Sequence, residues 1–132
     1  MRLAGILFTL SLNLMATQMP DAQNSPPVEN QFLYTLTLTR GDLLKTGPTK
    51  DESDAVEQHY NRLLEYTKKG VVILAGRTQT NDETTLGIVI FRAASEDAAR
   101  EFMNDDPAVQ KRVMKATLFP FKVALADGKA IY

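Results

Sequence analysis

The segment Val56–Arg77 constrains the fold more than any other, because it predicts a helix that passes directly into a strand. Gly70 stands where a left-handed residue usually ends a helix, and the strand Val71–Thr78 begins immediately afterwards. Helices and strands must therefore share one fold. The apolar residues of the helix recur at i, i+4, i+7 and i+8, as in a helix with one buried stripe: Val56, Tyr60, Leu63, Leu64 and, more weakly, Thr67.

The sequence leaves the start of this helix open. Thr49 with Glu52 fits a capping box, whereas Asp51 or Ser53 fits a simple cap. Acidic residues cluster before the helix and basic residues cluster at its end, an order that suits the helix macrodipole.

Four strands and two main helices are expected along the chain. Patterns of alternation predict strands over 31–39, 71–78, 85–93 and 117–125. Ser95 fits the cap of a second helix over 96–104, and Asp106-Pro107 begins a short helix that runs to about Ala116. The resulting order, β-α-β-β-α-β, is that of a ferredoxin-like α+β fold, an antiparallel four-stranded sheet with both helices on one face.

The strand 85–93 is apolar on both faces, with Ile88 and Ile90 on one and Val89 and Phe91 on the other. The helices cover only one face of the sheet, and an exposed apolar face usually marks an interface. We therefore predict a homodimer formed through the open sheet face. The alternative is that the N-terminal segment of the same chain covers this face.

The N-terminal residues read as a targeting segment followed by a linker. Met1–Met15 contains one arginine and then a mainly apolar run, which fits residues 1–22 as a signal peptide and is too short for a stable membrane anchor. Export to the periplasm or the medium follows from this interpretation; if the true start is Met15 or Met19, the protein is cytoplasmic. Residues 23–30 read as a linker, 31–126 as the folded domain and 127–132 as a tail.

Composition excludes several functional classes. The chain has no cysteine and one histidine, which excludes disulfides, thiol catalysis and a multi-histidine zinc site within one chain. The net charge is −1 and no basic block is present, so nucleic acid is not an expected partner. No nucleotide-binding or serine-hydrolase motif occurs. The composition leaves an oxygen-ligand Mg²⁺ or Ca²⁺ site open, but no carboxylate spacing resembles a dedicated loop, and we expect neither a metal nor a cofactor.

The single histidine is the main candidate for chemistry. His59 lies at the edge of the apolar stripe, where it fits either a packed core histidine or a general acid or base beside a cleft. Asp106 is expected to cap the helix that begins at Pro107, and its second oxygen is free to orient an imidazole. Asp105 is the competing carboxylate, and spacing alone does not decide whether either meets His59.

Two further residues are candidates for substrate binding. Arg77 ends the second strand, where it can hold an anionic group; the plainer interpretation is a solvated arginine or a partner of Asp82. Tyr34, like Tyr60, can supply a hydrogen bond in a pocket, although core tyrosines with a satisfied hydroxyl are commoner.

Taken in order, several of these pieces resemble the YciI-like (YCII-related) family over roughly residues 31–125. The first half of the resemblance rests on His59-Tyr60, Leu63-Leu64, Gly70-Val71 and Leu74-Ala75-Gly76. The second half rests on Ile88-Val89, Ser95-Glu96-Asp97-Ala98-Ala99, Asp106-Pro107, Pro120-Phe121 and Leu125.

The resemblance implies a dimeric ferredoxin-like α/β-barrel and a histidine–aspartate pair, which maps onto His59 and Asp106. It also implies metal-free proton transfer or elimination on a small, often cyclic organic molecule. The chain departs from the family pattern at Arg77, where proline is usual, and at Ala108, where an aromatic residue is usual, so the substrate is not carried over. The alternatives to an enzyme are a non-catalytic module that binds a small ligand and a scaffold that only dimerises.

Overall fold

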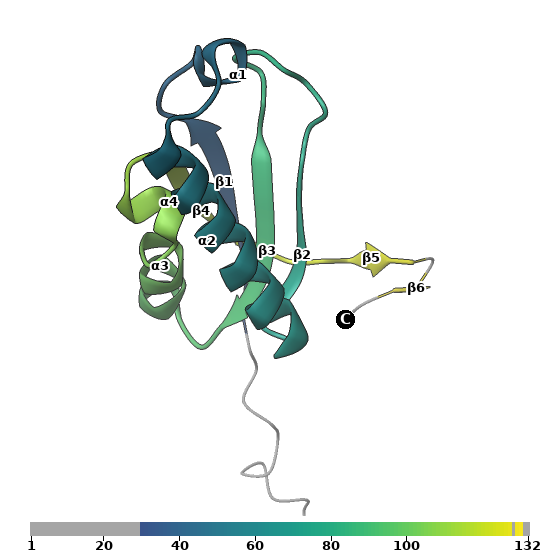
Figure 1. The fold of residues 1–132 in the computed structure, drawn as a ribbon. Helices are drawn as coiled ribbons and strands as arrows, with labels where there is room; N and C mark the ends of the chain where they lie inside the picture. Colours follow the sequence, from purple (N-terminus) through teal and green to yellow (C-terminus); the bar gives the residue numbers. More distant parts are fainter. Residues whose placement is uncertain (1–29, 128, 131–132) are drawn as a thin grey trace, which may run out of the picture.

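The computed structural model describes residues 30–127 and 129–130. The expected signal peptide and nearly all of the expected linker lie outside the described residues, so export stays a prediction. Helices cover one face of an antiparallel sheet, which confirms the α+β ferredoxin-like fold (Figure 1). The elements are β1 (Asn30–Leu38), α1 (Leu43–Thr46), α2 (Lys50–Lys68), β2 (Val72–Arg77), β3 (Gly87–Ala93), α3 (Glu96–Asn104), α4 (Pro107–Gln110), β4 (Met114–Phe121), β5 (Leu125–Ala126) and β6 (Lys129–Ala130).

The strand order of the main sheet is β2-β3-β1-β4, with every pair antiparallel. Residues directly opposite each other share a face, so the register gives the core row by row. Phe32, Phe91 and Val72 form one row beneath the helices, and Tyr34 and Val89 belong to the next. These residues are all buried, as the alternation in the sequence predicts.

Both ends of α2 are closed by local hydrogen bonds. The hydroxyl of Thr49 accepts from the Glu52 N–H, and the Glu52 carboxylate accepts from the Thr49 N–H, which confirms the capping box. At the other end Gly70 has φ +75°, and the N–H of Val71 bonds the carbonyl of Tyr66, as in a Schellman motif.

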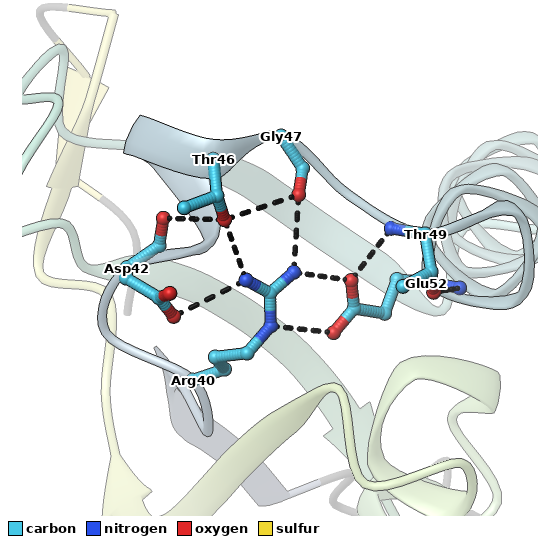
Figure 2. A network of polar contacts seen from close by, with 6 residues as sticks. All are labelled: Arg40, Asp42, Thr46, Gly47, Thr49 and Glu52. Atoms are coloured by element: carbon cyan, nitrogen blue, oxygen red, sulfur yellow. Dashed lines mark hydrogen bonds and ion pairs between the residues drawn. The ribbon is translucent and has the colours of Figure 1, made fainter.

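Arg40 ties the loop after β1 to the start of α2 (Figure 2). Its guanidinium donates to both oxygens of Glu52, at 3.1 and 2.7 Å, and also to Asp42, to Thr46 and to the carbonyl of Gly47. Such a planar fork matches a carboxylate on two bonds at once. The loop 40–49, which the sequence left without structure, is thus fixed and contains the short helix α1.

This network predicts how stability depends on pH. Hydrogen bonds from Arg40, with those from Thr49, lower the pKa of Glu52 from 4.5 to about 2. Because the folded pKa is the lower one, the stabilisation is complete above pH 4.5 and is lost as the pH falls towards about 2. We expect Glu52→Gln to have a flatter plot of unfolding free energy against pH in that window, measured by urea denaturation. Arg40→Gln should lose the same part of the slope, and a wild-type slope in both variants would contradict the prediction.

The segment after α3 differs from its predicted structure. The short helix ends at Gln110 instead of Ala116, because Arg112 takes a left-handed φ of 57° and the chain turns into β4 at Met114. The last strand correspondingly ends at Phe121. Part of the expected tail, Lys129–Ala130, pairs with Leu125–Ala126 in a small hairpin that projects from the domain (Figure 1).

The face of the sheet opposite the helices carries a row of apolar side chains, two of which are exposed. Leu74, Ile90, Leu33 and Phe119 lie in one row across all four strands. Leu74 is 49% exposed and Phe119 is 45% exposed, while Ile90 between them is buried. Among the described helices, none is long and apolar enough to cross a membrane.

Candidate active site

The start of α4 brings Asp106 against the middle of α2. Asp106 caps α4, with Pro107 in the first helical position, and its Oδ1 accepts from the Ala108 N–H at 3.0 Å. The same carboxylate meets His59, whose Nδ1 lies 2.8 Å from Oδ1 and 2.7 Å from Oδ2. The capping role and the contact with the imidazole therefore coexist. Asp105, the competing carboxylate, is an exposed residue at the end of α3.

Tyr34 supports the carboxylate from the opposite side. Its hydroxyl donates to Oδ2 of Asp106 at 2.8 Å, and both side chains are fully buried. The ring of Tyr34 packs edge-on against Phe91 in the core, 5.6 Å between centroids. This corrects the expectation that Tyr34 binds substrate: the tyrosine lies behind Asp106, within the core, and its hydroxyl is already used.

These contacts shift the pKa values of both buried groups. Burial acts to raise the pKa of Asp106, but hydrogen bonds from His59, Tyr34 and the Ala108 N–H outweigh it and lower the pKa. Burial and the neighbouring carboxylate raise the pKa of Tyr34, so its hydroxyl stays protonated and remains a donor. An ionised carboxylate only accepts hydrogen bonds, so His59 donates from Nδ1.

His59 lines a cleft of about 480 Å³ between α2 and the sheet. Because Nδ1 is held by Asp106, Nε2 is the ring nitrogen left to face the cleft, and the side chain is 13% exposed. The wall is mostly aliphatic. The lining residues are Leu36, Leu38, Val56, His59, Tyr60, Leu63, Leu64, Thr67, Leu74, Ala75, Gly76, Arg77, Thr85, Gly87, Ile88, Val89 and Met114.

The predicted apolar stripe of α2 forms the cleft wall more than the core. Leu63 is buried, but Tyr60 is 65% exposed and Leu64 is 41% exposed, although the spacing predicted that both would be buried. On the opposite wall, small residues occupy one helix-facing position in each of two strands, Ala75 in β2 and Gly87 in β3. These small strand residues leave part of the space that forms the cleft beneath α2.

A bulge in β2 aims Arg77 at this cleft. Val72 faces the helices, and an extra residue shifts the register before Leu74, so that Ala75 and Arg77 face the helices as well. Arg77 stands across from Gly87, which in turn pairs with Leu36. Without the bulge, strict alternation would turn Arg77 to the open face.

Residues 33–122 match the family model of the YCII-related domain. This chain belongs to the YCII-related family. The matched residues include β1 from its fourth residue, both main helices and all of β4, so the candidate site lies within the YCII-related domain.

Two solved structures are similar in fold to this YCII-related chain. One is an uncharacterised protein, TM1266 from Thermotoga maritima, with 14% identity, a TM-score of 0.46 and 71% of this chain and 99% of that chain covered. The other is a 5-chloro-2-hydroxyhydroquinone dehydrochlorinase, TftG from Burkholderia phenoliruptrix AC1100, in complex with 2,5-dihydroxybenzoquinone. It has 20% identity and a TM-score of 0.48, and the match covers 70% of this chain and 93% of that chain. No curated protein matches the sequence significantly.

Arg62 is a residue of the YCII-related domain that the sequence marked only as a helix-end charge. It lies one turn after His59, its guanidinium packs 4.2 Å from the ring centre of Phe102, and it donates to the Phe102 carbonyl at 3.0 Å. It thereby holds α2 against α3 beside the pair His59 and Asp106. The aromatic residues Tyr66 and Phe102 are the sequence features that could have indicated this role. Their separation along the chain, however, gives no sign that their rings meet in the fold.

Within the described part of the chain, no group of three or more histidine, cysteine or acidic residues is arranged to hold a metal ion.

Proposed function

We propose that this protein is an acid–base enzyme in which His59 transfers a proton to or from a small organic molecule in the cleft. The observation that carries the proposal is the pairing of the His59 Nδ1 with the buried carboxylate of Asp106 while the imidazole lines a cleft. A carboxylate that accepts from Nδ1–H sets the tautomer with the lone pair on Nε2, the arrangement of a general base.

The remaining contacts suit such a base. Asp106 is held by Tyr34 and Ala108 as well as by His59, so it does not need to move as the imidazole gains a proton. The resulting imidazolium is stabilised by the fixed charge beside it, as in other histidine–aspartate pairs. A mostly aliphatic wall limits water around the reacting atom and accepts an apolar or cyclic molecule.

Proton transfer can be tested before the natural substrate is known. Ligands from a thermal-shift screen of cyclic and carbonyl compounds would be incubated with the protein in D₂O, and NMR would follow deuterium entering carbon positions next to carbonyl groups. We expect exchange that depends on the protein for at least one ligand. Ligands that bind in the cleft without any exchange or conversion would support the alternative, a non-catalytic binding module.

We also propose that the protein forms a homodimer through the open sheet face. The supporting observation is the apolar row across the sheet, in which Leu74 and Phe119 are exposed, together with Phe121, which is exposed on the same face of β4. Burying each such side chain stabilises an interface by about 1.5–3 kcal/mol before the costs of association.

A charge on this face is expected to separate the protomers. Phe119→Glu places an unpaired carboxylate among apolar side chains, so we expect a monomer in sedimentation experiments at concentrations where the wild type is a dimer. Gln79→Glu adds the same charge on an exposed loop and should leave the dimer intact. A monomeric wild-type protein would contradict the proposal directly.

A further inference from the structure

We infer that the cleft binds a small organic acid, with Arg77 holding its carboxylate while its apolar body lies against the aliphatic wall. The inference rests on the proposed acid–base site and names the class of molecule that this site accepts. It begins from the bulge in β2, which turns Arg77 from the open sheet face to the cleft. Bulges commonly re-aim a side chain at a functional site.

Arg77 faces the cleft as an uncompensated charge. Among the described residues it makes no ion pair, and its side chain is exposed. Its cross-strand neighbour Gly87 has no side chain to cover it. Asp82, the partner that the sequence suggested for Arg77, accepts instead from the hydroxyl and N–H of Thr84.

The other lining groups are complementary to an anion with an apolar body. None of the described residues that line the cleft is acidic. The hydroxyl of Thr67 donates to the Leu63 carbonyl, and that of Thr85 donates to the Thr80 carbonyl. Both hydroxyl protons are therefore already used, which leaves Arg77 as the main donor for an anionic ligand. The cleft thus presents one permanent cation beside aliphatic side chains, with His59 on the helix wall and Arg77 on the strand wall.

The shape of the guanidinium narrows the ligand class further. Its planar fork matches both oxygens of a carboxylate, whereas the ammonium of lysine acts as a point charge. The ligand would therefore be oriented by its carboxylate at Arg77, with the rest of the molecule extending along α2 towards His59. A volume of about 480 Å³ suits a molecule with one or two rings.

The experiment compares acids with their amides. Cyclohexanecarboxylate, benzoate and 2-naphthoate, each with its neutral carboxamide, would be titrated by NMR up to millimolar concentration against four proteins. These are the wild type, Arg77→Gln, Arg77→Lys and Arg100→Gln, the last of which removes the same charge from α3, outside the cleft.

We expect the wild type to bind at least one acid more tightly than its amide, and Arg77→Gln to lose about tenfold to a hundredfold of the acid affinity without a change for the amide. Arg77→Lys should fall between these, and Arg100→Gln should match the wild type. Equal affinity for acids and amides, unchanged acid binding in Arg77→Gln, or no saturable binding of any acid would each overturn the inference. His59→Gln should still bind the acid, because Arg77 is intact. Acid binding together with no deuterium exchange in any ligand of the carbonyl screen would reject the catalytic proposal alone.

Discussion

Replacing Asp106 with alanine is expected to lower the free energy of unfolding by about 3–5 kcal/mol, the range for breaking a buried charged pair. The loss has three connected sources: the buried Tyr34 hydroxyl loses its acceptor, His59 loses its partner and α4 loses its cap. Loss of an acceptor costs about 1–3 kcal/mol and loss of a cap about 0.5–2 kcal/mol, and the terms overlap. Because a domain of this size has about 5–15 kcal/mol in total, the variant should be marginally stable.

Urea denaturation followed by far-UV circular dichroism would measure this change, since the chain has no tryptophan for fluorescence. Asp105→Ala is the matched control, because it removes an adjacent, exposed carboxylate and should change stability by less than about 0.5 kcal/mol. Asp106→Asn should fall between the two, because its amide oxygen can still accept from Tyr34 or Ala108. An Asp106→Ala variant as stable as the control would show that the carboxylate does not support the fold.

Replacing His59 with glutamine is expected to reduce proton transfer by about 10²–10⁴-fold, the usual contribution of a general base. Glutamine can still donate a hydrogen bond to Asp106 but has no nitrogen that accepts a proton near neutral pH. The melting temperature should therefore change little while exchange of deuterium into the bound ligand slows. This pattern separates a catalytic role from a structural one.

The single histidine allows a direct check on the same residue. Nitrogen-15 NMR of the imidazole should show the Nδ1–H tautomer in the wild type at a pH where the ring is neutral, because Asp106 accepts from Nδ1. Gln58→Ala, on the exposed side of α2, is the control for exchange and should keep the wild-type rate. An Nε2–H tautomer, or exchange that survives in His59→Gln, would remove His59 from the proposed chemistry.

Most of the fold could be predicted because its signals are local. The capping box at Thr49 and the glycine at position 70 set the ends of α2, and alternation in β1 and β3 assigns their buried sides. The end of α4 was missed because nothing in the sequence marks Arg112 as a left-handed residue. The end of the last strand was also placed wrongly, at residue 125. The apolar alternation in the sequence continues past Phe121, but the pairing of β4 with β1 stops there.

The candidate site was predictable only in part. The meeting of His59 and Asp106 followed from the family resemblance, since 47 residues separate them and spacing carries no information over that distance. Tyr34 was assigned to the ligand because a tyrosine on a strand has no sequence signal for which partner its hydroxyl takes. The direction of Arg77 depends on one extra residue in β2, which alternation cannot locate in a segment where most side chains are small or apolar.

The double use of the Asp106 carboxylate affects how relatives of this protein should be interpreted. A homologue without catalytic activity would still need this aspartate to begin α4 and to accept a hydrogen bond from Tyr34, so its retention says little about activity. The fold does not require the imidazole in the same way, because Asp106 still accepts hydrogen bonds from Tyr34 and the Ala108 N–H without it. Under the proposed function, the residue at position 59 is therefore the better guide to which homologues can carry out the proton transfer.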